Sequence, residues 1–416
     1  MNYAEWHEDA QSGAYPPLDL AAALNPTSAC ASQSDRLIQL CAHVRTNASD
    51  LAEIERLART LKTADWRPLI LEARAQGVDS FVFMKLAEAG ALALVPEPLV
   101  VGMRQRWANI TVNTRRLESV LERLLTRFAE AGAPVIILKG MALTRRLYPE
   151  LALRPISDID LLVRPEDLAR WEPALYAEGF APELARSEPL SKHVLRFREM
   201  QFRNDRSQMV EAHIALSRYP AYRQAFALRA IWANARPLPG APGQAFILAP
   251  DDELAFLCLH YAVQHRIGRL IWLTDVAEIA RRIPDQQAWD ALVKRLATRR
   301  VVAPVAVTLA HARALLDAPI PDAALEQLRQ AALEPAERRA WDSATRSMSG
   351  LRWYLSQLAV VRTAQERATL LLNGGAALAG RVRRRARRQS SGREHASEDR
   401  LNDGGEGAAS ASEPSE

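Results

Sequence analysis

The spacing of hydrophobic residues predicts helices on both sides of a differently patterned middle segment. Apolar residues recur every three or four positions from residue 34 to 112 and again from 251 to 373, as in helices that bury one face. The most regular helix spans residues 113–131. Its apolar face carries Leu117, Leu121, Leu124 and Phe128. The sequence thus predicts a helical N-terminal region and a helical C-terminal domain.

Residues 113–250 combine strand and helix signals. Short apolar runs and period-two alternation predict strands over 135–138, 158–163, 194–203 and 208–214. The last two form a hairpin across Asn204–Ser207, and a helix over 165–178 ends before Gly179. This arrangement predicts an α+β fold, in which a small mixed β-sheet core is flanked by helical regions.

The two ends of the chain differ in composition from the part between them. Residues 1–33 carry Gly, Pro and Ser with little periodicity, and we expect them to be loosely ordered. From residue 374 to 416 the composition turns to Gly, Ala, Ser, Glu and Arg, which cannot bury a core, so a disordered tail is expected. Its Arg-rich block, 381–388, precedes an acidic segment. A solvated tail is the expected state, although such a block also suits contact with RNA or acidic lipid.

Composition and charge argue against several classes of protein. The formal net charge of +5 is small for 416 residues and unevenly distributed, so it does not indicate a nucleic-acid-binding body. The three cysteines have no paired spacing, which argues against a disulfide framework and a zinc site. No apolar run approaches the roughly 20 residues that span a bilayer, and the N-terminus lacks a signal-peptide pattern. We therefore expect a cytoplasmic protein with no membrane partner.

Segment 134–163 contains the strongest candidate chemistry. A buried strand leads into Lys139-Gly140 and the start of a helix, where free backbone N–H groups can bind an anion. Asp158 and Asp160 stand two positions apart at the head of the next strand, which places both carboxylates on one face. Carboxylate oxygens suit Mg²⁺, which proteins usually hold through one or two carboxylates together with substrate phosphates.

The second arm of the predicted hairpin adds further polar side chains. Met209, Glu211 and His213 share one face of this strand. Glu211 can supply a third carboxylate, and His213 is a candidate to orient Glu211 or the nucleotide without itself binding metal. The residues alone also allow a solvent-facing Glu211 and a purely structural His213.

Together these motifs resemble the nucleotidyltransferase superfamily. The runs LKGMAL, RPISDIDLLV and VEAHIAL are similar to its little-characterised bacterial branch, whose members carry Lys-Gly before the Asp-x-Asp strand. The likeness extends over roughly residues 50 to 300. It implies a small mixed sheet with helices, and transfer of a nucleotidyl group from an NTP to an acceptor hydroxyl.

The resemblance also implies roles for individual residues. The metal-binding and catalytic carboxylates would be Asp158, Asp160 and Glu211. Lys139 and Gly140 would contact the triphosphate, and Arg154, just before the carboxylate strand, could neutralise developing charge. Two Mg²⁺ ions can activate the attacking oxygen and stabilise the leaving pyrophosphate. The acceptor could be a small molecule, a peptide, another protein or an RNA end, and the sequence does not choose among them.

Other interpretations stay open. Asp158 and Asp160 could form ordinary ion pairs with Arg154 and Arg164. The superfamily usually has Ser after the glycine, where this chain has Met141. This difference favours the alternative of a catalytically inactive nucleotide-binding or regulatory module with the same fold. A metal-dependent phosphodiesterase is a third reading, because three carboxylates also suit hydrolysis.

The C-terminal helices carry three further polar residues of interest. His260 and His265 are five positions apart, which is not the spacing that puts two metal ligands on one face of an α-helix, so we expect core or cleft residues. Asp275 lies within an apolar helix and needs a partner if it is buried. Arg266 and Arg269 are the candidate partners.

Overall fold

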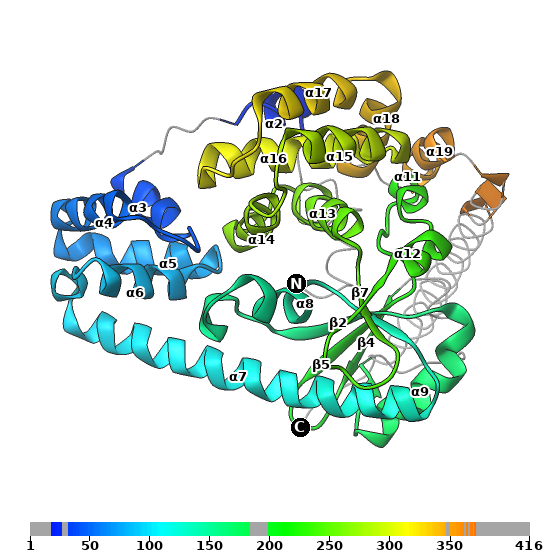
Figure 1. Cartoon of the computed structure of the whole chain (residues 1–416), viewed down its shortest axis with the longest axis horizontal. Helices are drawn as coiled ribbons and strands as arrows, with labels where there is room; N and C mark the ends of the chain where they lie inside the picture. Colours follow the sequence, from blue (N-terminus) through cyan, green and yellow to red (C-terminus); the bar gives the residue numbers. More distant parts are fainter. Residues whose placement is uncertain are drawn as a thin grey trace, which may run out of the picture. The chain divides into compact units, whose positions relative to one another are not determined.

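The described residues form one mixed β-sheet with helices before and after it (Figure 1). In this computed structural model the strand order is β3-β4-β5-β2-β1-β7-β6. β2 pairs in parallel with β5, and β1 with β7, while the other neighbours are antiparallel. The strands are β1 (Val135–Ile137), β2 (Asp158–Leu162), β3 (Ala181–Pro182), β4 (Glu199–Arg203), β5 (Met209–His213), β6 (Arg236–Pro237) and β7 (Ala245–Ile247). The predicted α+β fold is confirmed.

The structure describes most of the chain between residues 18 and 371. The described ranges are 18–26, 32–183, 199–346 and 350–361, with part of 363–371. They belong to two compact units, residues 1–348 and 349–416. The first unit contains the sheet, and the second contains helix α19 (Gly350–Val360). The predicted tail, 374–416, lies outside the described residues.

Two other predicted segments are described only in part. Of the N-terminal residues 1–33, the described portion includes the short helix α2 (Leu20–Ala23), in which Leu20 is buried. Of the first hairpin arm, residues 194–198 lie outside the described residues, and 199–203 form β4. The five-part division of the chain stays a prediction.

Helices precede and follow the sheet. Before it lie α3 (Gln33–Cys41), α4 (Ala48–Thr60), α5 (Trp66–Ala75), α6 (Asp79–Glu88) and α7 (Glu97–Glu130). Between its strands lie α8 (Lys139–Leu147), α9 (Leu168–Ala177), α11 (Pro220–Arg223) and α12 (Leu228–Asn234). After it come α13 (Pro250–Leu259), α14 (Leu270–Ala280), α15 (Gln286–Arg299), α16 (Val302–Leu316), α17 (Asp322–Ala332) and α18 (Pro335–Thr345). None of the described helices is long and apolar enough to cross a membrane.

One face of the sheet packs on helices α7 and α9. Because side chains alternate along a strand, Ile159 and Leu161 of β2 point into this layer. There Phe128 of α7 stacks on Trp171 of α9, with ring centres 5.4 Å apart and planes at 16°. This apolar layer buries one side of β2 completely, so the residues between, Asp158 and Asp160, must use the other side.

The opposite face of the sheet is turned towards helices α13 and α14 (Figure 1). Charged contacts join the two layers. Arg146 of α8 donates two hydrogen bonds to Glu253 of α13, at 2.8 and 2.9 Å. The face of the sheet that carries Asp158 and Asp160 therefore lies beneath the C-terminal helices.

The main differences from the sequence prediction are at element boundaries. Helix α7 begins at Glu97, and it continues without a break through residues 112–113, where the sequence suggests a division. Its buried stripe starts with Val100 and Met103, ahead of the regular leucine pattern. β7 has no sequence signal of its own, because three residues are too few to show alternation; it becomes a strand by pairing in parallel with β1.

Candidate active site

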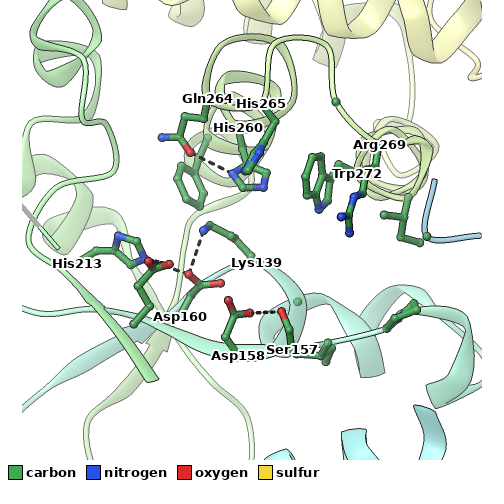
Figure 2. A pocket seen from close by; sticks show the side chains of 18 of the residues that line it. Lys139, Ser157, Asp158, Asp160, His213, His260, Gln264, His265, Arg269 and Trp272 are labelled. Carbon is green, nitrogen blue, oxygen red and sulfur yellow. Dashed lines mark hydrogen bonds and ion pairs between the residues drawn. The ribbon is translucent and has the colours of Figure 1, made fainter. Parts of the chain in front are cut away.

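A cavity of about 720 Å³ lies between the carboxylate face of the sheet and helices α13 and α14. Its floor is formed by β2, β5 and the start of α8, and its roof by residues 256–272 (Figure 2). Gln76 and Gly77, just after α5, line one end. This volume lies within the range of roughly 300–1,000 Å³ that small-molecule sites occupy.

The register of β2 and β5 brings two carboxylates together on the floor. Asp160 is the direct neighbour of Glu211 in this parallel pair, and Leu162 is the neighbour of His213. Ligand atoms of Asp160, Glu211 and His213 all lie within 4.8 Å of one another. The structure thus brings Asp160 and Glu211 together with His213, while Asp158, the third predicted metal ligand, lies outside this group, and the predicted metal-binding roles stay predictions.

Lys139 reaches Asp160 from the start of helix α8. Its Nζ donates a hydrogen bond to Oδ1 of Asp160 at 2.9 Å, and only 6% of the Asp160 side chain is exposed. The backbone of Lys139 is left-handed, with φ of 47°, a conformation that is uncommon outside glycine and recurs at functional sites. Burial by itself would lower the pKa of Lys139, but the surrounding carboxylates raise it above its ordinary value. Gly140 follows in α8 and lines the cavity.

His213 connects the carboxylates of the floor. Its Nε2 lies 3.0 Å from Oδ1 of Asp160 and 3.3 Å from Oε2 of Glu211, and its Nδ1 lies 3.6 Å from Glu199. Burial opposes protonation, but the charge of Glu211 and the bonds to both acids raise the pKa of His213 to about 10. Burial would likewise raise the pKa of Glu211, which His213 instead holds well below its usual value. Gln201 donates a further hydrogen bond to Glu211, at 3.1 Å.

Asp158 faces the same cavity but stands apart from this group. Its Oδ1 accepts a hydrogen bond from the Ser157 hydroxyl at 3.2 Å (Figure 2). Burial and the charge of Asp160 raise the pKa of Asp158 to about 6, against the opposing effect of Lys139. The two aspartates thus share a face of β2 but differ in their partners.

Arg154 is bound to a carboxylate of the roof. Its guanidinium makes hydrogen bonds of 2.9 to 3.1 Å to both oxygens of Asp275 in α14, and the Tyr148 hydroxyl donates to the same carboxylate at 2.5 Å. The prediction that Arg266 or Arg269 pairs with Asp275 is therefore wrong. Proximity in sequence suggested those residues, whereas the fold brings Arg154 to Asp275 from 121 positions away. Arg154 also lines the cavity, and its role towards a nucleotide stays a prediction.

The roof carries aromatic side chains that the sequence reasoning did not assign to a site. His260 and His265 lie on one face, with ring centres 4.3 Å apart, because residues His260–Gln264 form a π-helical turn. The expected core or cleft position is confirmed, since both histidines line the cavity, but the inference that they do not share a face is corrected, because a π-turn bonds each residue to the fifth one on. Trp272 of α14 completes the group, 4.2 Å from the His265 ring. A π-turn leaves no clear mark in a sequence.

A comparison with protein families shows which family the chain belongs to. A family described as uncharacterised nucleotidyltransferases matches residues 62–317. The chain belongs to this family. The matched region includes the whole floor and roof of the cavity, and membership implies an NTP as substrate. No curated protein and no solved structure matches the chain.

The floor fits the divalent ion that nucleotidyltransferases typically use. Asp160 and Glu211 present carboxylate oxygens from neighbouring strands to one cavity, and oxygen is the ligand that Mg²⁺ prefers. Asp158 adds a third carboxylate on the same face of β2. The positive charges of Lys139 and His213 offset part of the negative charge of this group.

Proposed function

We propose that the protein is a Mg²⁺-dependent nucleotidyltransferase that moves a nucleotidyl group from an NTP to an acceptor hydroxyl. The observation that carries the proposal is the β2–β5 register, which sets Asp160 beside Glu211 with Lys139 bound to the same carboxylate. Family membership supports the same chemistry. The helices around the cavity leave room for an acceptor whose identity is open: a small molecule, a peptide, a protein or an RNA end.

In the proposed reaction the acceptor oxygen attacks the α-phosphorus of the NTP. A bond forms between this oxygen and phosphorus, the bond to the β-phosphate bridging oxygen breaks, pyrophosphate leaves, and the acceptor proton passes to solvent. Asp158, Asp160 and Glu211 would hold two Mg²⁺ ions, which supply charge stabilisation for the attacking and leaving oxygens.

The chain's own cations bind and orient the triphosphate. Lys139 acts as a point charge for phosphate oxygens, and the start of α8, where Gly140 lines the cavity, offers backbone N–H groups to them. His213 holds Asp160 and Glu211 in place through its bonds to both. Arg154, fixed by Asp275, positions the loop that leads into Asp158.

The first test measures thermal stabilisation by each NTP, with and without Mg²⁺. A ligand that binds only the folded state adds about 2.7 kcal/mol at a hundredfold excess over its Kd, so no acceptor is needed. We expect at least one NTP to raise the Tm of the wild type only when Mg²⁺ is present. The double variant Asp160→Asn, Glu211→Gln should lose this shift.

The matched control is Asp205→Asn, the same chemical change at an exposed position in the β4–β5 turn. It should keep the full shift. Transfer itself is followed with NTP labelled at the α-phosphate, which should appear on an acceptor while pyrophosphate is released. Equal stabilisation of the wild type and the double variant would contradict the proposed site.

A second candidate is a nucleotide-binding module without catalysis. The observation that favours it is the close pair between Lys139 and Asp160, which already satisfies one oxygen of the central carboxylate. Met141, where the superfamily usually has Ser, points the same way. Mg²⁺-dependent NTP binding without transfer of the α-phosphate to any acceptor would favour this function over the first.

A further inference from the structure

The roof of the cavity presents an aromatic surface opposite the carboxylates. His265 lies 4.2 Å from Trp272 between ring centres, with the planes tilted by 35°, and His260 meets both rings edge-on, at 4.3 and 4.9 Å. The side chain of His260 is buried, and its Nδ1 is bonded to Gln264 at 3.0 Å. His260 is therefore a buried side chain that packs edge-on against the other two rings.

His265 and Trp272 are open to the cavity. His265 is exposed and Trp272 is half-buried, and both line the cavity wall. Within the described part of the chain, neither the His265 imidazole nor the Trp272 indole N–H has a hydrogen-bond partner. Rings packed for structural reasons alone usually bury their faces and satisfy their N–H groups. These two rings present accessible aromatic surface and polar atoms to a ligand.

The backbone that carries this surface is unusual in several ways. A π-helical turn ends at Gln264, and the next residues include Arg266 and Ile267, both left-handed, with φ of 54° and 60°. Gly268 follows, and a Cβ there would lie 2.5 Å from Trp272 Cζ3. Left-handed β-branched residues and π-turns cost free energy and occur often at functional sites. A strained backbone therefore holds His265 next to Trp272.

Lys139 lies between the floor and the roof of the cavity. Lys139 Nζ, which is bonded to Asp160, lies 6.0 Å from the centre of the Phe256 ring in the roof. Figure 2 shows Lys139 between the floor carboxylates and the roof histidines. A ligand that spans the two layers needs an anionic end for the floor and a flat ring for the roof.

We propose that the nucleobase of the NTP stacks on the His265–Trp272 pair while its triphosphate lies over the floor. This inference rests on the proposed function and extends it to the part of the substrate that the carboxylates do not touch. Bases stack readily on aromatic side chains whatever their identity, because every base has a π-face. Arg269, exposed and 5.6 Å from the Trp272 ring centre, adds positive charge at the rim.

The test compares two ligands that share a triphosphate but differ in the base. Isothermal titration calorimetry measures the Kd of Mg²⁺–NTP and of Mg²⁺–tripolyphosphate for the wild type, His265→Ala and Trp272→Leu. We expect the variants to bind NTP roughly tenfold or more weakly and tripolyphosphate with unchanged Kd. Trp272→Phe, which keeps a ring, should retain most of the NTP affinity.

Trp107→Leu is the matched control, since Trp107 is half-buried on α7, packs on Phe83 and does not line the cavity. It should bind both ligands like the wild type. His265→Ala alters an exposed side chain, so it keeps the test valid if Trp272→Leu folds poorly. Unchanged NTP affinity in both His265→Ala and Trp272→Leu overturns the stacking surface alone. Equal weakening for both ligands also overturns it. A wild type that binds neither ligand overturns the proposed function and this inference together.

Discussion

At the scale of single residues, backbone conformation decides where key side chains lie. Lys139 adopts φ of 47° at the start of α8, and its ammonium is bonded to Asp160. Gly268 has the opposite role, since its missing side chain leaves space for the Trp272 ring. In both cases the neighbouring structure fixes a conformation or a gap that the residue type alone would not predict.

We predict that Gly268→Ala destabilises the protein by about 1–3 kcal/mol, the usual cost of overpacking. The added Cβ would lie 2.5 Å from Trp272 and 2.9 Å from the Cβ of His265, so at least one ring must move. The matched control is Gly102→Ala in helix α7, where nothing lies within 4 Å. There alanine should stabilise by about 0.5–1 kcal/mol. Urea unfolding measures both, and a neutral Gly268→Ala would refute the packing argument.

At the scale of elements, a buried ion pair ties the floor of the cavity to its roof. Arg154 follows the 3₁₀ turn Leu151–Leu153 and precedes β2, while Asp275 belongs to α14. The exposed fractions of their side chains are 8% and 0%. The Tyr148 hydroxyl completes the group, and burial together with the Asp275 charge raises the pKa of Tyr148 well above its ordinary value.

We predict that Asp275→Asn lowers the free energy of unfolding by about 3–5 kcal/mol, because it leaves the buried Arg154 guanidinium without a charged partner. The same change at Asp251, which pairs with the largely exposed Arg295, should cost no more than about 1 kcal/mol. Denaturant unfolding of the two variants provides the comparison. Similar losses at both positions would mean that burial does not set the strength of the Arg154–Asp275 pair.

At the scale of the whole larger unit, residues far apart in sequence share one helical core. His311 of α16 shows this most directly. Its Nε2 lies 3.0 Å from the Ala23 carbonyl of α2, and its Nδ1 lies 3.0 Å from the Tyr261 hydroxyl of the π-turn. A carbonyl only accepts hydrogen bonds, so Nε2 carries the proton, and a neutral ring satisfies both contacts. Burial lowers the pKa of His311 below its ordinary value of 6.5.

This lowered pKa makes stability depend on pH. Below pH 6.5 the unfolded chain binds a proton at His311 that the folded protein does not, so the free energy of unfolding falls as the pH falls. We predict a weaker dependence in His311→Gln, which cannot titrate. Denaturant unfolding at several pH values between 8 and about 5 compares the two. Parallel profiles for the wild type and the variant would contradict a buried neutral His311.

The sequence by itself determined the composition of the floor. Asp158 and Asp160 are two apart, and so are Glu211 and His213, and strand alternation requires each pair to share a face. The glycine turn after a buried strand likewise marked Lys139 and the start of α8. These features follow from the fixed repeat of a strand and from a short local motif, so the sequence alone can predict them.

Only the tertiary structure decided the roof and the partners that lock it to the floor. Strand register paired Asp160 with Glu211, 51 positions further along the chain, and helix packing brought Asp275 to Arg154 rather than to its neighbours in sequence. The π-turn that aligns His260 and His265 depends on the packing around it. Such contacts follow from burial of non-local surfaces, and no periodic pattern in the sequence encodes which surfaces meet.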